Sequence, residues 1–180
     1  IQPCDAVGGV GNFVNQPVVG AEDAWEYPQG GFGKPRNATE VRRTMWGDLM
    51  AGVMPIYSDW NIQIGGTGKG EPDARRAFDF FYRNTNYRSY VQLNSLVSAS
   101  AGQIASGIRG SQYLVYDQSG GSITVNLSGV PSTKTFSVLW YNPATGASAT
   151  ATAVQGGASR TLSPPASIFP APADEVLLLK

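Results

Sequence analysis

The 180-residue chain contains no histidine and only one cysteine, Cys4. Without histidine, it cannot build a Ser-His-Asp or Cys-His catalytic group, or a histidine-ligated metal site, from its own residues. A single cysteine excludes an internal disulfide and a cysteine zinc cluster. Cys4 is interpreted as a small buried hydrophobic residue, or as half of a disulfide to sequence outside this chain. No metal and no cofactor is expected.

Charge is also scarce, since only 14% of the residues are charged, with 13 acidic against 13 basic side chains. A neutral chain of this kind has no electrostatic footprint for nucleic acid or for an anionic membrane surface. No apolar run approaches the ~18 residues of a membrane-spanning helix. The chain opens at Ile1 and shows no signal peptide, so we expect that processing or truncation has removed its true start.

Small polar residues and aromatics are abundant while lysine is rare, which is typical of a secreted or periplasmic protein. Two triplets, Asn37-Ala38-Thr39 and Asn126-Leu127-Ser128, fit the N-glycosylation pattern. Asn37 and Asn126 are therefore candidate glycosylation sites if the protein passes through a secretory pathway that adds sugar.

The first half of the chain alternates short apolar runs with helical patterns. Pro17–Ala21 predicts a buried parallel strand, and Val53–Tyr57 predicts a second one. Between them, Asn37 is a good N-cap with Glu40 three residues later, which predicts a capped helix that ends at Ala51-Gly52.

A second helix is predicted from Pro72 to about Arg83, because proline suits a first helical turn and apolar residues recur at helical spacing. The predicted apolar face consists of Ala74, Ala77, Phe78, Phe81 and Tyr82. The order strand, helix, strand, helix indicates a parallel α/β sheet or barrel. Two parallel strands are not stable alone, so the barrel is expected to be incomplete in this chain.

The pattern changes after about residue 86. Short alternating runs separated by glycine, proline and asparagine turns predict an antiparallel β-sandwich. The expected strands lie at 113–116, 123–127, 136–140, 148–154, 159–162 and 176–179. The predicted fold class is therefore α/β plus all-β: the last two β/α units of a TIM-type barrel over residues 1–86, a connector over 87–102, and a β-sandwich over 103–180.

Two carboxylates, Glu22 and Glu26, follow the first apolar run, with Asp23 and Trp25 between them. Loops after the strands of a parallel barrel gather on one face, where such folds keep their chemistry. Glycoside hydrolysis needs two carboxyl groups, about 5–5.5 Å apart for retention or about 6.5–9.5 Å apart for inversion. The two glutamates are candidate catalytic residues, and the alternative interpretation is a solvated acidic turn.

Aromatic residues follow both predicted strands of the first half. Trp25 and Tyr27 come after the first strand, while Tyr57 and Trp60 come at the end of the second, next to Asp59. Aromatic faces stack on sugar rings, and an aspartate can hydrogen-bond a hydroxyl. Trp25, Tyr57, Asp59 and Trp60 are candidate substrate-binding residues. The alternative is that the aromatics pack the loops together and that Asp59 is a solvated loop residue.

The segment from Pro17 to Tyr57 resembles the apiosidase-like glycoside hydrolases, a (β/α)8-barrel family. The residues that carry the resemblance are Pro17-Val18-Val19-Gly20-Ala21-Glu22, Trp25-Glu26, Val41-Arg42-Arg43, Trp46, Leu49-Met50-Ala51-Gly52 and Tyr57. The chain departs from the commoner pattern of the family at Met54-Pro55-Ile56 and Ser58-Asp59.

The tail resembles the small β-sandwich that follows this barrel and that carries a collagen-binding label. The residues are Tyr113-Leu114-Val115-Tyr116, Trp140-Tyr141-Asn142-Pro143-Ala144-Thr145-Gly146 and Val176-Leu177-Leu178-Leu179. None of these residues points to collagen itself.

The resemblance implies that Glu22 ends the seventh barrel strand and is the nucleophile, with Glu26 as a supporting or substrate-contacting carboxylate. The acid/base residue would lie near the fourth strand, outside this chain. The implied partner is a poly- or oligosaccharide, and the chain alone is expected to be inactive.

A different class of function remains open, namely a non-catalytic structural, filament-forming or carbohydrate-binding fragment. Two strands and two helices would expose large apolar faces. These faces need cover from the missing barrel part, from another chain or from self-assembly.

Overall fold

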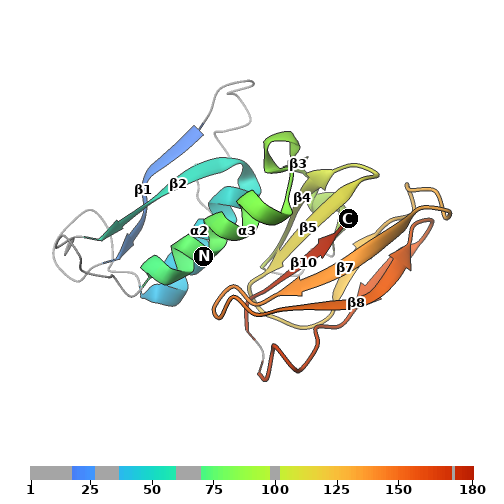
Figure 1. Ribbon diagram of the computed structural model, residues 1–180. Helices are drawn as coiled ribbons and strands as arrows, with labels where there is room; N and C mark the ends of the chain where they lie inside the picture. The colour runs from blue at the N-terminus through green and yellow to red at the C-terminus, as the bar shows by residue number, and fades with distance from the viewer. Residues whose placement is uncertain (1–17, 27–36, 60–69, 98–101, 172) are drawn as a thin grey trace. The chain divides into compact units, whose positions relative to one another are not determined.

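The computed structural model describes residues 18–26, 37–59, 70–97, 102–171 and 173–180 (Figure 1). The chain divides into two compact units, residues 1–84 and 85–180.

The first unit runs β1 (Val18–Glu26), α2 (Ala38–Ala51), β2 (Val53–Asp59) and α3 (Glu71–Asn84). β1 and β2 pair in parallel, with α2 in the connection between them (Figure 1). The predicted order is confirmed, but both strands are longer than predicted. Each continues past its apolar run, because the parallel ladder pairs Ala24 with Tyr57 and Glu26 with Asp59. The acidic segment is thus strand rather than turn.

Helix α2 begins and ends where the sequence predicts. The Asn37 side chain accepts a hydrogen bond from the Glu40 backbone N–H at 3.0 Å, and the Glu40 carboxylate accepts one from the Asn37 N–H at 3.0 Å. This capping box satisfies two N–H groups that the helix itself leaves unpaired. At the other end Gly52 has a φ of 80°, the left-handed conformation that favours glycine as a helix cap.

The buried face of α3 is rotated from the predicted one. Ala74, Ala77 and Phe81 are buried as predicted, but Tyr82 is 77% exposed and Phe80, which the prediction left out, is buried. Trp46 of α2 explains the difference, since its ring centroid lies 5.4 Å from that of Phe80 and 5.3 Å from that of Phe81. The helix turns these two rings inward and leaves Tyr82 in solvent.

The second unit is mostly antiparallel sheet. A six-stranded sheet has the order β3-β4-β5-β10-β7-β8, and β6 and β9 form a separate two-stranded sheet. The elements are η1 (Tyr87–Ser89), β3 (Val91–Gln92), η2 (Asn94–Leu96), β4 (Gln103–Ile108), β5 (Gln112–Asp117), β6 (Ile123–Asn126), β7 (Thr135–Tyr141), β8 (Ser148–Gln155), β9 (Ser159–Leu162) and β10 (Glu175–Leu179).

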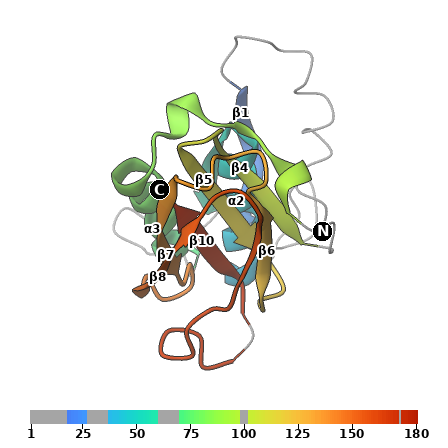
Figure 2. The same ribbon diagram turned by 90° about the vertical axis from the view of Figure 1, so that its right-hand side faces the viewer.

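One hydrophobic core joins the two sheets. It takes Val115, Trp140 and Leu177 from the six-stranded sheet and Val125 and Leu162 from the β6–β9 pair. Figure 2 shows this unit with β6 set against the larger sheet. Alternate residues of β6 and β7 enter this core, as the period-two pattern predicts.

The stretch predicted as a connector, 87–102, contributes structure to the second unit. β3 pairs with β4, and Leu93 is 1% exposed within the core. β4 itself, Gln103–Ile108, was not predicted as a strand. Its sequence, QIASGI, contains small and polar residues that give a weak strand signal. It is a strand because it pairs with β5 over its whole length.

β8 ends the six-stranded sheet and pairs with β7 alone among the described strands. Six of its eight residues are exposed, and none is charged. The β7–β8 register shifts where Thr152 and Ala153 stand opposite Ser137, which is a β-bulge.

The loop after β7 is held by the buried side chain of Asn142. Its Oδ1 accepts hydrogen bonds from the backbone N–H groups of Ala144 at 2.9 Å and Thr145 at 3.1 Å. Its Nδ2 donates to the Ile168 carbonyl at 2.8 Å. The Asn-Pro-x-Thr-Gly motif is therefore a structural turn that ties two loops of the second unit together.

Candidate functional site

The carboxyl ends of β1 and β2 bring several predicted site residues into register. Trp25 pairs with Ser58 and Glu26 pairs with Asp59, each the last or next-to-last residue of its strand. Neighbouring strands lie about 4.8 Å apart, so two acidic residues occupy facing positions on adjacent parallel strands. The sequence predicted that these two strand ends are neighbours, and the ladder agrees with that.

Glu22 lies elsewhere in the same strand. The β1–β2 register shifts between Gly20 and Ala24, so that Ala21–Asp23 stand opposite Ile56 alone. Glu22 is therefore at the centre of a bulge within β1, rather than directly after a strand end as the apolar run suggested. Bulges break the regular alternation of a strand and often occur beside active sites.

Tyr57 has a packing role. It is half-buried and packs against the small core of Val41, Met45 and Ala74 from the two helices. The contact accounts for an aromatic residue at this position, and sugar binding by Tyr57 stays a prediction. Trp60, Tyr27 and Cys4 lie outside the described residues.

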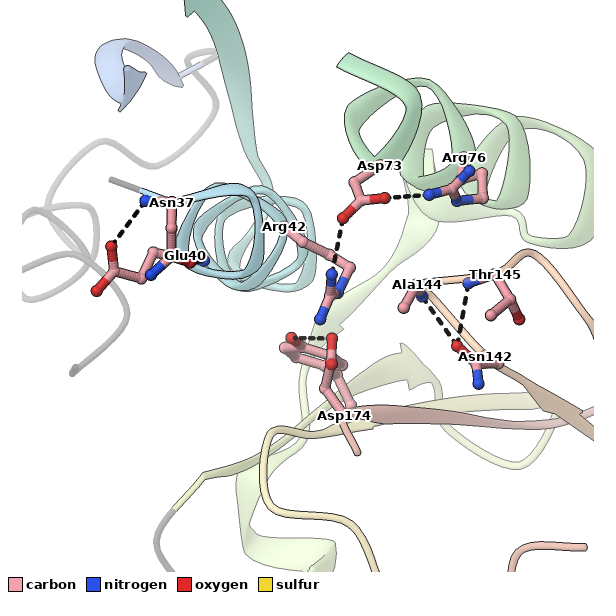
Figure 3. A network of polar contacts seen from close by, with 10 residues as sticks. Asn37, Glu40, Arg42, Asp73, Arg76, Asn142, Ala144, Thr145 and Asp174 are labelled. Carbon is pink, nitrogen blue, oxygen red and sulfur yellow. Dashed lines mark hydrogen bonds and ion pairs between the residues drawn. The ribbon is translucent and has the colours of Figure 1, made fainter. Parts of the chain in front are cut away.

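The two helices of the first unit are joined by a buried ion pair. Arg42 Nη1 donates to Asp73 Oδ2 at 2.7 Å, with both side chains less than a tenth exposed. Asp73 also pairs with Arg76 one turn along α3 (Figure 3). Asp73 is the partner that the sequence analysis did not single out.

Both candidate glycosylation residues take part in local hydrogen bonds. Asn37 caps α2 (Figure 3), and Asn126 Oδ1 accepts from the Ser128 N–H at 3.0 Å and from the Ser128 hydroxyl at 2.7 Å. Both residues are exposed. Modification of either residue stays a prediction.

The second unit contains a polar cluster that the sequence analysis missed. Gln103, Asp117 and Glu175 occupy paired positions across β4, β5 and β10. Burial, and then the charge of Asp117, raises the pKa of Glu175 to about 8. The signal in the sequence was the pair Asp174-Glu175 directly before four apolar residues, where a buried strand begins.

The described residues contain neither a metal-binding cluster nor a membrane-spanning helix. In that part of the chain, no group of three or more His, Cys, Asp or Glu side chains could hold a metal ion. No helix among the described residues is long and apolar enough to cross a membrane.

A comparison with models of protein families finds a match that includes the whole second unit. The model of the family described as "Putative collagen-binding domain of a collagenase" matches residues 80–180. The chain belongs to this family. No curated protein matches the chain.

Solved structures resemble nearly the whole chain. One chain titled a glycoside hydrolase family 5 protein from Bacteroides vulgatus has a TM-score of 0.71 and 17% identity, over 96% of this chain and 43% of that chain. Another, titled a glycoside hydrolase, has a TM-score of 0.67 and 16% identity, over 91% of this chain and 42% of that one. The chain thus spans less than half the length of these structures, and at such identity the likeness concerns the fold.

Proposed function

We propose that the chain is the C-terminal part of a glycoside hydrolase, formed by the last two β/α units of a TIM-type barrel and a β-sandwich. The observation that carries the proposal is the parallel β1–β2 pair, whose carboxyl ends place Glu26 and Asp59 in register. Active sites of (β/α)8 barrels lie at this end of the strands. The fold likeness to chains titled glycoside hydrolase, which extend well beyond this chain, supports the proposal.

The proposed substrate is a poly- or oligosaccharide, and the proposed mechanism uses two carboxyl groups. Glu22 is the proposed nucleophile, because the β1 bulge takes it out of the regular strand alternation. Glu26 is the proposed supporting carboxylate, next to substrate-contacting Trp25, Tyr57, Asp59 and Trp60. The acid/base residue would come from a part of the barrel outside this chain. We also propose a secreted or periplasmic location.

The test is a glycosidase assay on the complete gene product, with Glu22→Gln and Glu26→Gln compared with the wild type. Loss of the nucleophile is expected to lower kcat on the order of 10⁴-fold, a scale that removal of catalytic side chains reaches in other enzymes. Loss of the supporting carboxylate is expected to cost much less. Asp79→Asn, an exposed carboxylate on α3, is the matched control and should keep full activity.

Two results would count against these roles. An unchanged rate in Glu22→Gln would remove Glu22 from the mechanism. A larger loss in Glu26→Gln than in Glu22→Gln would exchange the two roles, because Glu26 is the residue that actually ends β1.

A second candidate function is a non-catalytic structural or carbohydrate-binding piece. It is favoured by the exposure of Met54 and Ile56 on β2, at 45% and 44%, which implies an apolar surface that something else covers. The intact mass of the native protein separates the candidates. A mass near 19.1 kDa would favour the second candidate, and a much larger mass would favour the glycosidase.

The family description names collagen, so collagen is a further ligand to test for the second unit. Co-sedimentation with fibrillar collagen and with insoluble polysaccharide, in parallel, compares the two ligands directly. Retention on polysaccharide alone would agree with a carbohydrate-binding role.

A further inference from the structure

The two faces of the β1–β2 pair differ in what covers them. Along β2, Val53 and Pro55 are buried, and Tyr57 packs against the small core of the two helices. Met54 and Ile56, which alternate with them, are 45% and 44% exposed. Successive residues of a strand belong to opposite faces of the sheet. One face is therefore covered by the helices, and the other, the open face, carries Met54 and Ile56.

The same alternation places Ser58 on the open face, because it follows Ile56 by two residues near the carboxyl end of β2. The parallel ladder sets Trp25 of β1 opposite Ser58, and the two strands lie side by side in Figure 1. Residues paired in a ladder share a face of the sheet. Trp25 and Ser58 therefore occupy neighbouring positions on the open face, with backbones about 4.8 Å apart.

The open face corresponds to the inside of the proposed barrel. In (β/α)8 barrels the helices lie outside the ring of strands, and inward-facing residues fill the interior in layers of bulky side chains. Met54 and Ile56 fit such layers, which accounts for two large apolar side chains exposed on β2. Ser58 lies about 6.6 Å beyond Ile56 along the strand. It is therefore at the carboxyl end, where the filled interior of such barrels gives way to the active site.

Trp25 and Ser58 combine two kinds of side chain that recognise a sugar. An indole ring offers a broad apolar face on which a sugar ring can stack. A serine hydroxyl group both donates and accepts hydrogen bonds, as a sugar hydroxyl does. Met54 and Ile56, the other described open-face residues of β2, offer neither. The change from large apolar residues to serine thus marks the point where this face of β2 can bind a polar ligand.

We propose that Ser58 contacts the substrate of the glycosidase, by forming a hydrogen bond with a hydroxyl group of the sugar ring that stacks on Trp25. This role rests on the proposed function of the chain, and it adds a substrate-binding residue that the sequence analysis did not single out. Tyr57 falls on the helix-covered face, in agreement with its packing against the helices. Ser58 is therefore better placed than Tyr57 for contact with a sugar.

The position of Ser58 also agrees with that of the proposed nucleophile. The bulge residues Ala21–Asp23, which include Glu22, stand opposite Ile56, two residues before Ser58 along β2. A sugar ring held by Trp25 and Ser58 would therefore lie beside the segment that carries Glu22. Binding and reaction would then share one end of the β1–β2 pair, as the loops of (β/α)8 barrels share one face.

The test uses the complete gene product and a panel of nitrophenyl glycosides as substrates. Ser58→Thr keeps a hydroxyl group, whereas Ser58→Val gives nearly the same shape without one. Ser58→Val is expected to raise KM about two- to tenfold, the range for one neutral hydrogen bond, with a smaller change in kcat. Ser58→Thr should stay near the wild-type KM. Ser89→Ala removes an exposed hydroxyl group from the second unit and should match the wild type.

Equal KM values in Ser58→Val and Ser58→Thr, in a protein that is otherwise active, would overturn the role of Ser58 and leave the proposed function in place. A wild type that hydrolyses none of the glycosides would overturn the proposed function, and the role of Ser58 with it. Thermal unfolding of each variant shows whether it folds. Should Ser58→Val lower Tm, Ser58→Ala serves as the second variant, with the same rise in KM expected.

Discussion

Gly107 illustrates how much a single backbone position in β4 can constrain the sequence. Its φ is 155°, and a Cβ atom there would lie 2.1 Å from the backbone carbonyl oxygen of Gln112. Neither the backbone angle nor the space accepts a side chain, because the obstacle is main chain of the neighbouring strand and not a movable side-chain end.

Gly107→Ala is therefore expected to lower the free energy of unfolding by at least about 2 kcal/mol. The measurement is urea unfolding followed by circular dichroism. Gly129→Ala is the matched control, because Gly129 is exposed and nothing lies within 4 Å of a Cβ atom built there. Equal stability of the two variants would contradict the close approach of β4 and β5.

Glu175 gives the second prediction for a single residue. Burial and the facing Asp117 raise its pKa from 4.5 to about 8, while a hydrogen bond from the Gly121 backbone opposes the shift. Between these two pH values the folded chain holds a proton that the unfolded chain has released. The contribution of Glu175 to stability is therefore present at low pH and is lost as pH rises through about 8.

The expected result is a fall in unfolding free energy from pH 5 to pH 8 that is absent in Glu175→Gln. The slope difference can reach about 1.4 kcal/mol per pH unit, the limit for one proton. Denaturant titrations of both proteins at each pH give the comparison. Parallel stability curves for the two proteins would show that Glu175 does not titrate in this range.

Among the elements, those set by neighbouring residues could be predicted, whereas the packing of α2 on α3 through Trp46 and Phe80 could not. The capping box of α2 and the alternation of β6 and β7 could be predicted, because each is a local rule written in neighbouring residues. The predicted face of α3 was right at Ala74, Ala77 and Phe81 but wrong at Tyr82, and it left out Phe80. The contact of Phe80 with Trp46 of α2 decides this detail, and it joins residues far apart in the sequence. β4 was missed because its partner strand, and not its own residues, makes it a strand.

The same limit applies to the candidate sites. Glu22, Glu26 and Asp59 could be named from their place after apolar runs, but the bulge at Glu22 depends on the β2 register. The polar cluster of Gln103, Asp117 and Glu175 could not be predicted from the sequence, because its members come together only through the strand order β4-β5-β10.

The Arg42–Asp73 pair yields a prediction at the scale of the two helices. Asp73→Ala removes the carboxylate that pairs with the buried Arg42 guanidinium and is expected to cost about 3–5 kcal/mol. The double variant Arg42→Met, Asp73→Leu removes both charges and should recover most of that loss. Thermal unfolding by circular dichroism measures both.

The exposed pair of Glu71 and Arg75 on α3 is the internal control. Glu71→Ala should change stability little, because solvent screens an exposed ion pair. If the double variant were as unstable as Asp73→Ala, the loss would come from packing and not from the removal of the carboxylate beside Arg42.

For the whole molecule, the two units differ in how complete their cores are. The second unit has one continuous core shared by both of its sheets. The first has two helices on a single pair of parallel strands and exposes Met54 and Ile56. A two-stranded sheet is marginal in water without further strands or cover.

Residues 85–180 alone are therefore expected to fold cooperatively, with dispersed amide signals in NMR and a sharp thermal transition. Residues 1–84 alone are expected to be unfolded or aggregated. A folded, monomeric 1–84 piece would contradict the view that its β2 surface needs cover from outside. Failure of 85–180 to fold would show that the second unit depends on the first.

The bulge in β8 has a consequence for the behaviour of the protein in concentrated solution. An uncharged, exposed edge strand can add further strands from other molecules. Thr152 and Ala153, which stand opposite the single residue Ser137, divide that edge into short segments, Ser148–Ala151 and Val154–Gln155, whose donors and acceptors are out of phase with each other. A straight incoming strand can match one segment at a time, so the bulge, rather than charge, limits growth of the sheet into fibrils.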